Sequence, residues 1–322
     1  MRIGDAPTPP ISAWNRTKLH KMLATVAPAL FVLFWSTGFI VARAITPHAD
    51  GQFFLFCRFV AAAIVWGALA AIEHRRWPPA RRVAEHLAVG AMMMGCYLCL
   101  SFWAVSQGLP AGIMALMGAL QPLLTASYML IRGKESGSPS LWWGLSIGFL
   151  GVVLVLLPRI EGSHGTGSAF AIIAGLLAVA AVTVGTLSQK RVQDEDLRIA
   201  NTLQNIGASL AAVLGICFAG AIRWDNTGAL WGLMSWSVIV TSIFAQGLLM
   251  WMLRRSGASH VTALLLLVPP VAALMAYALF RETLTLLQLA GFGFALAGVV
   301  LARRAHALAP PSGGWKGKTR SG

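Results

Sequence analysis

The sequence predicts an all-α integral membrane protein whose ten transmembrane helices form two halves of five, arranged as an inverted-topology repeat. Three observations predict this fold. Of the 322 residues, 57% are hydrophobic and only 11% are charged, whereas a soluble domain carries about 25% charged residues. Ten apolar runs are long enough, at about 20 residues each, to cross about 30 Å of hydrocarbon as helices. Finally, features of the first half return 147 positions later in one ungapped register.

The apolar runs lack the regular alternation of a membrane β-barrel, so helices are the remaining way to pair the backbone in lipid. We expect spans at residues 24–45, 52–72, 86–106, 109–131, 140–157, 167–188, 199–220, 229–252, 257–279 and 287–303. The chain then divides into a cytoplasmic N-terminal segment, two homologous halves and a disordered cytoplasmic tail, at residues 1–23, 24–158, 167–305 and 306–322. The loops are too short to hold a separate soluble domain.

The repeat is clearest at residues that are unusual inside a membrane span or next to one. The matching positions are Gly38 with Gly185, Arg43 with Lys190, Pro122 with Pro269, Glu135 with Glu282, Gly144 with Gly291, and Gly-Val-Val-Leu at 151–154 with the same string at 298–301. A repeat of this length indicates a duplicated helical bundle, because solenoid repeats have periods of about 20–50 residues.

The distribution of basic residues predicts the orientation. With the N-terminus in the cytoplasm, twenty Lys and Arg residues fall on the cytoplasmic side and four on the other side. The positive-inside rule therefore predicts a multi-pass protein of the inner (plasma) membrane with both termini cytoplasmic. This placement also explains most of the net charge of +14 without a nucleic-acid partner, since the basic residues do not gather on one soluble face.

Five spans per half is an odd number, so the second half must enter the membrane from the opposite face. Two homologous halves of opposite topology are the construction of secondary transporters, whose substrate site lies near the midplane where the halves meet.

Residues for catalysis are missing from the predicted spans. None of the eleven Asp and Glu residues lies in the central part of a span, and neither does a histidine: His260 lies near the cytoplasmic end of its span, and His86 is the first residue of its own. Aspartyl proteolysis would need two buried aspartates, and a zinc protease would need H-E-x-x-H on a helix. Cys96 and Cys99 have C-x-x-C spacing in midspan without a second pair, which favours packing. We therefore expect no enzymatic activity, no cofactor and no metal site.

The first span carries a candidate substrate site. Trp35 lies near its middle beside Ser36 and Thr37. An aromatic wall with two hydroxyl groups suits a small substrate. The alternative is a core tryptophan whose neighbouring hydroxyls bond to their own helix.

Pro122 and Pro269 lie near the centres of equivalent spans in the two halves. Each removes an intrahelical hydrogen bond and frees a carbonyl group. Such interruptions are tolerated where a helix faces protein or a wet cavity, and paired interruptions indicate a transporter site. The alternative is a plain structural kink.

Further polar side chains lie in midspan on other helices: Tyr97, Gln121, Thr183 and Gln246. We expect them to face a cavity and to belong to the substrate-binding site, because an unpaired amide in hydrocarbon costs on the order of 4–8 kcal/mol. A helix–helix hydrogen bond would satisfy them equally well. Arg58 lies about 10 Å into the second span, where we expect it to snorkel outward or to bind carbonyl groups in a structural role.

These motifs together resemble a known family. They are Trp35-Ser36-Thr37-Gly38-Phe39, Arg58-Phe59, midspan Pro122 and Pro269, and Glu135 and Glu282 with the glycine-rich spans after them. With ten spans and a five-plus-five repeat, the sequence resembles the drug/metabolite transporter superfamily, specifically bacterial EamA-type permeases, over about residues 24–304.

The resemblance implies an inner-membrane carrier, commonly an exporter of amino acids, related metabolites or toxic compounds. It also implies a central cavity built chiefly from spans 1, 3, 4, 6, 8 and 9, and it assigns Trp35, Ser36, Thr37, Pro122 and Pro269 to the substrate site. Members of the family carry very different substrates, so the resemblance does not name one.

We predict a carrier that moves a small neutral or zwitterionic metabolite or drug-like solute outward by alternating access. Its expected partners are this small-molecule substrate and membrane lipid, with no nucleic acid, and a homodimer is left open. The alternative is a membrane-embedded scaffold or lipid-handling protein without solute transport. The inverted repeat argues against that alternative, because near-equivalent halves are what a two-state carrier needs.

Overall fold

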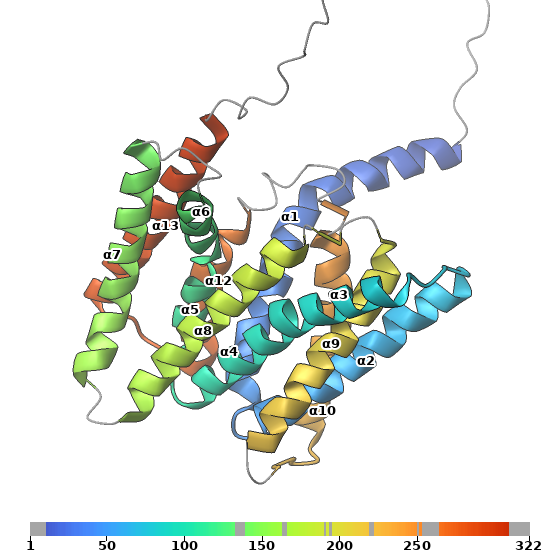
Figure 1. The fold of residues 1–322 in the computed structure, drawn as a ribbon, viewed down its shortest axis with the longest axis horizontal. Coiled ribbons are helices and arrows are strands. Elements are labelled where there is room, and N and C mark those ends of the chain that lie inside the picture. The colour runs from blue at the N-terminus through green and yellow to red at the C-terminus, as the bar shows by residue number, and fades with distance from the viewer. Residues whose placement is uncertain are drawn as a thin grey trace, which may run out of the picture.

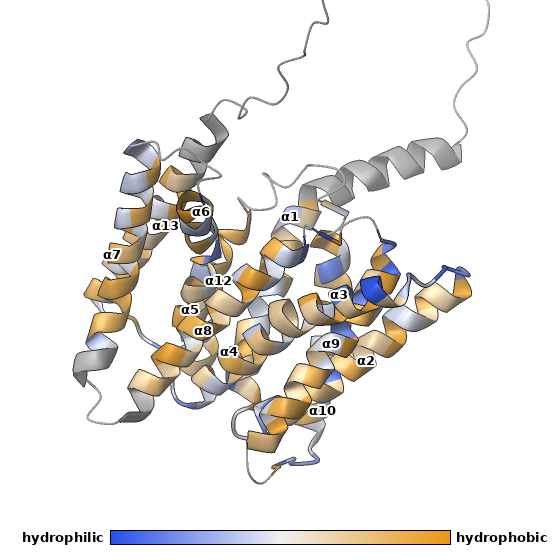
Figure 2. Cartoon of the chain, viewed as in Figure 1, coloured by the Kyte–Doolittle hydropathy of each residue, from blue (hydrophilic) through white to orange (hydrophobic). Residues whose placement is uncertain are grey.

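The computed structural model describes residues 11–132, 139–162, 166–189, 191–192, 195–218, 222–249, 251–252 and 264–308 (Figure 1). Its first half contains α1 (Ile11–Ile45), α2 (Gly51–Ile72), α3 (Ala80–Gly90), η1 (Ala91–Cys96), α4 (Tyr97–Ser106), α5 (Ala111–Gly118), α6 (Gln121–Ile131) and α7 (Pro139–Gly162). The second half contains α8 (Thr166–Gln189), α9 (Leu197–Phe218), α10 (Gly228–Trp236), η2 (Ser237–Ala245), α12 (Val268–Phe280) and α13 (Leu286–Leu308). Apolar residues dominate these helices along most of their length (Figure 2).

The prediction of an all-helical ten-span membrane protein is confirmed. Within the described residues, eight helices are long and apolar enough to cross a membrane, and shorter apolar helices at Val268–Phe280 and Leu286–Ala302 stand where the last two spans are predicted. Several boundaries differ: the third span begins at Ala80 and not at residue 86, and α7 continues to Gly162. α1 begins before residue 24, and α13 continues three residues into the predicted tail. The start of the ninth predicted span, with His260, lies outside the described residues.

Two departures from regular α-helix recur at the repeat spacing. The third and eighth spans each contain a π-helical segment, η1 and η2. The fourth and ninth spans are each broken by a turn, at residues 119–120 and 266–267. Adding 147 to the first break gives the second, and adding it to η1 gives residues 238–243, inside η2. The two halves therefore share their irregular backbone as well as their sequence.

The two prolines explain where these breaks fall. Pro122 and Pro269 occupy first-turn positions of α6 and α12. A missing backbone N–H is harmless there, because the first turn of a helix has no intrahelical acceptor for it. The sequence predicts both prolines inside continuous spans, whereas the structure places each at the start of a second helical piece.

Glycine contacts join α7 to α13, which lie side by side (Figure 1). An ideal Cβ on Gly298 would lie 2.2 Å from the backbone nitrogen of Gly148, and one on Gly151 would lie 2.2 Å from the backbone nitrogen of Ala295. The repeat offset of 147 relates the two pairs, because Gly298 corresponds to Gly151 and Gly148 corresponds to Ala295. Exchange of the halves therefore preserves this interface, as a pseudo-two-fold axis requires.

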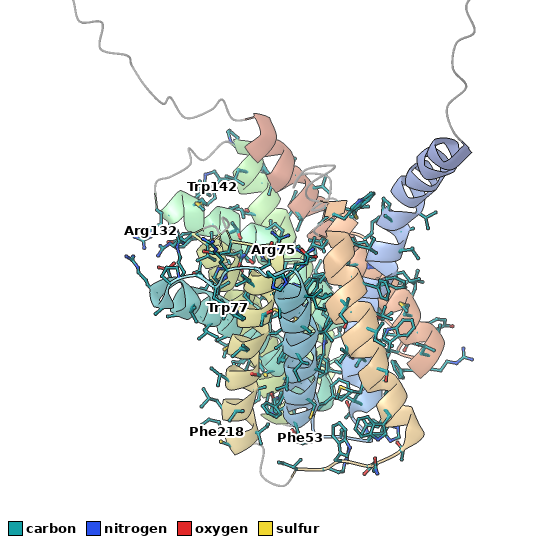
Figure 3. All side chains as sticks on the ribbon, turned by 90° about the vertical axis from the view of Figure 1, so that its right-hand side faces the viewer. Phe53, Arg75, Trp77, Arg132, Trp142 and Phe218 are labelled. Atoms are coloured by element: carbon teal, nitrogen blue, oxygen red, sulfur yellow. The ribbon has the colours of Figure 1, made fainter. Side chains whose placement is uncertain are left out.

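Charged residues join the two halves at one end of the bundle. Figure 3 shows Arg75 and Arg132 towards this end, away from Phe53 and Phe218. Glu73 lies 2.8 Å from Arg75 and 2.6 Å from Arg198, across the loop after α2 and the start of α9. We call this the Arg75 end and the opposite one the Phe53 end.

The halves also meet at the Phe53 end, where the loop between α1 and α2 touches the segment before α10. The backbone N–H of Asp50 donates to the carbonyl of Arg223 at 2.9 Å, and that of Asp225 donates to the carbonyl of His48 at 2.8 Å.

Replacing Gly298 by alanine tests the glycine interface. The added methyl group would overlap the backbone of Gly148. Overpacking of this kind costs about 1–3 kcal/mol, so we expect the thermal unfolding midpoint of the detergent-solubilised protein to fall by several degrees. Gly293→Ala is the matched control on the same helix, because no atom of a described neighbouring helix lies within 4 Å of an ideal Cβ at that position. Equal midpoints for the two variants would refute the close approach.

Candidate functional site

The first candidate region surrounds the break between α5 and α6. Pro122 has no N–H, so the carbonyl of Gly118 lacks its usual helical donor. The phenolic oxygen of Tyr97 lies 2.9 Å from an ideal Cβ position on Gly118, so the tyrosine occupies the space that a side chain would fill. Gln121 Nε2 donates to Thr186 Oγ1 at 2.7 Å and links α6 to α8. The structure therefore brings Tyr97, Gln121 and Pro122 around one helix break.

The second candidate region surrounds the other break, at the start of α12. The buried Ser36 hydroxyl donates to the Val32 carbonyl at 2.7 Å and lies 3.3 Å from the Val268 carbonyl, directly before Pro269. The half-buried ring of Trp35 packs in the apolar cluster that contains Val32 and Val268. Trp35, Ser36 and Pro269 thus lie together.

These two regions are related by the repeat. The offset of 147 maps Ser36 onto Thr183 and Gln121 onto Val268. In each half, the first span therefore packs against the broken span of the opposite half. Thr183 is buried and donates to the carbonyl of Val179 at 2.7 Å. Sequence reasoning missed Thr186 as the partner of Gln121, although Thr186 lies three residues beyond Thr183, on the next turn of the same helix.

Thr37 faces a different neighbour. Trp236 Nε1, on α10, donates to Thr37 Oγ1 at 3.0 Å, and the Thr37 hydroxyl donates to the Phe34 carbonyl at 2.6 Å. Thr37 thus joins the first span to the eighth, next to the second candidate region.

Gln246 lies in a separate polar contact. Its Nε2 donates to Asn201 Oδ1 at 2.8 Å, and both side chains are buried. This is the helix–helix hydrogen bond that the sequence leaves open as an alternative. Asn201 belongs to a buried polar face of α9 that sequence reasoning missed, although helical spacing reveals it. The face consists of Asn201, Thr202, Gln204, Asn205 and Ser209.

Arg58 does not snorkel outward, and within the described residues it bonds to a hydroxyl and not to a carbonyl group, so these two details of the expectation are wrong, while its structural role is not tested. Its side chain is buried, with 6% of the residue exposed. Its Nε donates to Ser242 Oγ, in η2, at 3.0 Å. Trp66 Nε1 donates to the carbonyl of the same serine at 3.3 Å.

Glu282 ties the halves together at the Phe53 end. One carboxylate oxygen lies 3.3 Å from Arg43 Nε, and the other accepts the backbone N–H of Ala111 at 3.1 Å. Ala111 begins α5, and a helix N-terminus favours a carboxylate. A single side chain of the second half thus holds two elements of the first. The repeat-related residues Glu135 and Lys190 lie outside the described residues.

One hollow lies away from these regions. A hollow of about 420 Å³ on α7 is lined by Pro139, Trp142, Trp143 and Ser146 and contains none of the candidate residues. Trp142 and Trp143 are exposed, as tryptophans at a membrane interface are. No cluster of three potential metal ligands occurs among the described residues.

Comparisons with known proteins agree with the duplicated architecture. The sequence model of the EamA-like transporter family matches twice, at residues 22–157 and 169–304. An uncharacterized inner membrane transporter of Escherichia coli K12, YedA, is 22% identical over 285 residues, covering 87% of this chain and 91% of the relative. A protein of Salmonella typhimurium named a probable amino-acid metabolite efflux pump is 24% identical, covering 84% and 92%.

A solved crystal structure has the same fold. It superposes with a TM-score of 0.60 at 19% identity, covering 88% of this chain and 98% of that chain.

Replacing Gln246 by leucine tests whether its hydrogen bond is structural. The change leaves Asn201 Oδ1 buried without its donor, which costs about 1–3 kcal/mol. We therefore expect a lower thermal unfolding midpoint. Tyr97→Phe is the contrasting variant, because no described residue forms a hydrogen bond with the Tyr97 hydroxyl, and its midpoint should stay at the wild-type value. A Gln246→Leu midpoint at or above wild type would contradict the structural role.

Proposed function

Because this chain belongs to the EamA-like transporter family, we propose that it moves a small metabolite or drug-like solute across the inner membrane by alternating access. The observation that carries the proposal is the pair of repeat-related helix breaks, each facing the first span of the opposite half. Broken helices at the junction of inverted halves are where such carriers bind their substrates. Trp35, Ser36, Thr37, Tyr97, Gln121, Pro122, Thr183 and Pro269 are the proposed substrate-binding residues, and Gln246 supports them from the eighth span.

Unequal packing of two repeat-related interfaces supports a two-state mechanism. α9 lies directly on the third span: an ideal Cβ on Gly90 would be 2.0 Å from the Gln204 carbonyl oxygen, and one on Gly207 would be 2.0 Å from that of Leu87. Within the described residues, the equivalent interface, between α2 and η2, has fewer contacts. In a two-state carrier, one conformation has the first interface tight and the second loose, and the other conformation has the reverse. The unequal packing suits one of these two conformations.

The contacts of Glu282 suit a closed gate in this mechanism. The positive-inside rule places the termini and the Arg75 end in the cytoplasm, and the Phe53 end outside. The Glu282 contacts with Arg43 and Ala111 would then close the external side and would have to separate before a solute could leave.

We propose efflux of amino acids or related compounds as the direction and substrate class. The relative named a probable amino-acid metabolite efflux pump supports this choice. The polar groups of the proposed site are hydroxyls and an amide beside an aromatic ring, which suit a neutral or zwitterionic solute. A scaffold or lipid-handling protein without solute transport is the alternative.

Export from cells that express the chain tests this proposal. We expect one class within a panel of amino acids, nucleosides and toxic analogues to leave faster than from control cells. Trp35→Ala should reduce this export by about tenfold, because an aromatic contact worth about 1.4 kcal/mol corresponds to a factor of ten. Trp142→Ala, an exposed tryptophan on α7, is the matched control and should export at the wild-type rate.

Well-inserted protein that produces neither export from cells nor uptake into reconstituted vesicles would favour the scaffold alternative. Uptake without export would keep the carrier and reverse the direction. Equal losses in the two tryptophan variants would remove Trp35 from the site.

A further inference from the structure

Arg58 is a buried charge without a counter-charge in the described structure. It lies seven residues after the start of α2 and is 6% exposed. A guanidinium group has five N–H donors. Only the Nε–H has a partner among the described residues, the hydroxyl of Ser242 at 3.0 Å. No carboxylate of the described chain lies within ion-pair distance of it.

The sequence offers no replacement for the missing partner. None of its eleven carboxylates lies in the central part of a predicted span. Asp50 is the acidic residue that precedes α2, and its side chain already caps that helix by accepting the N–H groups of Gln52 and Phe53. Arg58 is also too buried to pair with a lipid headgroup. An ionisable side chain inside a membrane span without a counter-charge indicates a functional site.

The neighbourhood of Arg58 has a second unusual feature. Ser242 belongs to η2, and π-helical turns occur frequently at functional sites. The repeat-related pair is Asn205 and Gly95, in α9 and η1. There an ideal Cβ on Gly95 would lie 2.6 Å from the Ala211 side chain, so that interface has no room for a larger residue. At equivalent positions of the repeat, Arg58 therefore lies in the sparser interface, between α2 and η2, and the neutral Asn205 lies in the tight interface, between α9 and η1.

We propose that Arg58 binds the carboxylate of the transported solute, with Ser242 orienting its guanidinium group. This inference rests on the proposed function and narrows its substrate class to compounds that carry a carboxylate, such as zwitterionic amino acids. Arginine suits this task because its planar N–H groups bind a carboxylate in a bidentate way. The solute would thus supply the counter-charge that the protein lacks.

A melting experiment tests the proposal without a substrate. In the purified, ligand-free protein, Arg58→Met removes an uncompensated buried charge and keeps a long side chain. We expect its unfolding midpoint to equal or exceed that of the wild type, because burial of an unpaired charge is costly and the substitution removes that cost. A structural arginine would give the opposite result. Arg198→Met is the control, because Arg198 lies 2.6 Å from Glu73 and its midpoint should fall.

Transport in reconstituted vesicles supplies the second test. The probes are L-amino acids and their carboxamides, which lack the carboxylate. The wild type should move an amino acid at least about tenfold faster than its amide, which corresponds to about 1.4 kcal/mol. Arg58→Gln should lose this preference, and Arg58→Lys should keep part of it.

The outcomes separate the two proposals. A lowered midpoint for Arg58→Met, or an Arg58→Gln protein that still prefers the acid as the wild type does, would overturn the role of Arg58. A wild type that moves the amide as fast as the acid would overturn it too. A wild type that moves neither probe would count against the amino-acid substrate of the proposed function, and the melting result alone would then decide the role of Arg58.

Discussion

The structure depends on one constraint: a break in a helix inside hydrocarbon must be covered by protein, because lipid cannot pair the freed backbone groups. This chain has two such breaks, at residues 119–120 and 266–267. α8 covers the first and α1 covers the second, so each half supplies the cover for the other. Each helix break is thus also a place where the two halves are in contact. Polar side chains lie there because the freed backbone groups need hydrogen-bond partners.

Around these breaks, the helices divide into regular and irregular elements. α7 and α13 meet through glycines at backbone contact and have no internal break. The spans with π-helical segments or breaks are the third, fourth, eighth and ninth. Close glycine contacts resist change, because a packed interface has no free volume. The regular α7 and α13 and the irregular spans therefore both occur in two copies, one in each half.

Much of this fold could be predicted from the sequence, because hydropathy reports which segments meet lipid and the offset of 147 reports the duplication. The prolines also predicted the places of the breaks, but not that each span would divide into two helices. Contacts between particular side chains of different helices could not be predicted from the sequence. Hydropathy does not tell which polar residues meet each other. Only the three-dimensional structure therefore identifies the Gln246–Asn201 bond, the Gln121–Thr186 bond and the burial of Arg58 against Ser242. The polar face of α9 was visible in its helical spacing and was overlooked.

The most direct test of alternating access at the repeat-related breaks is the accessibility of position 121. A single cysteine would be introduced as Gln121→Cys after replacement of Cys57, Cys96, Cys99 and Cys217, in a variant that still transports. A membrane-impermeant maleimide would then be added on one side of the membrane at a time. Alternating access predicts labelling from both sides, with reaction on one side preventing later reaction on the other. Labelling from one side only, or from neither, under all conditions would contradict it.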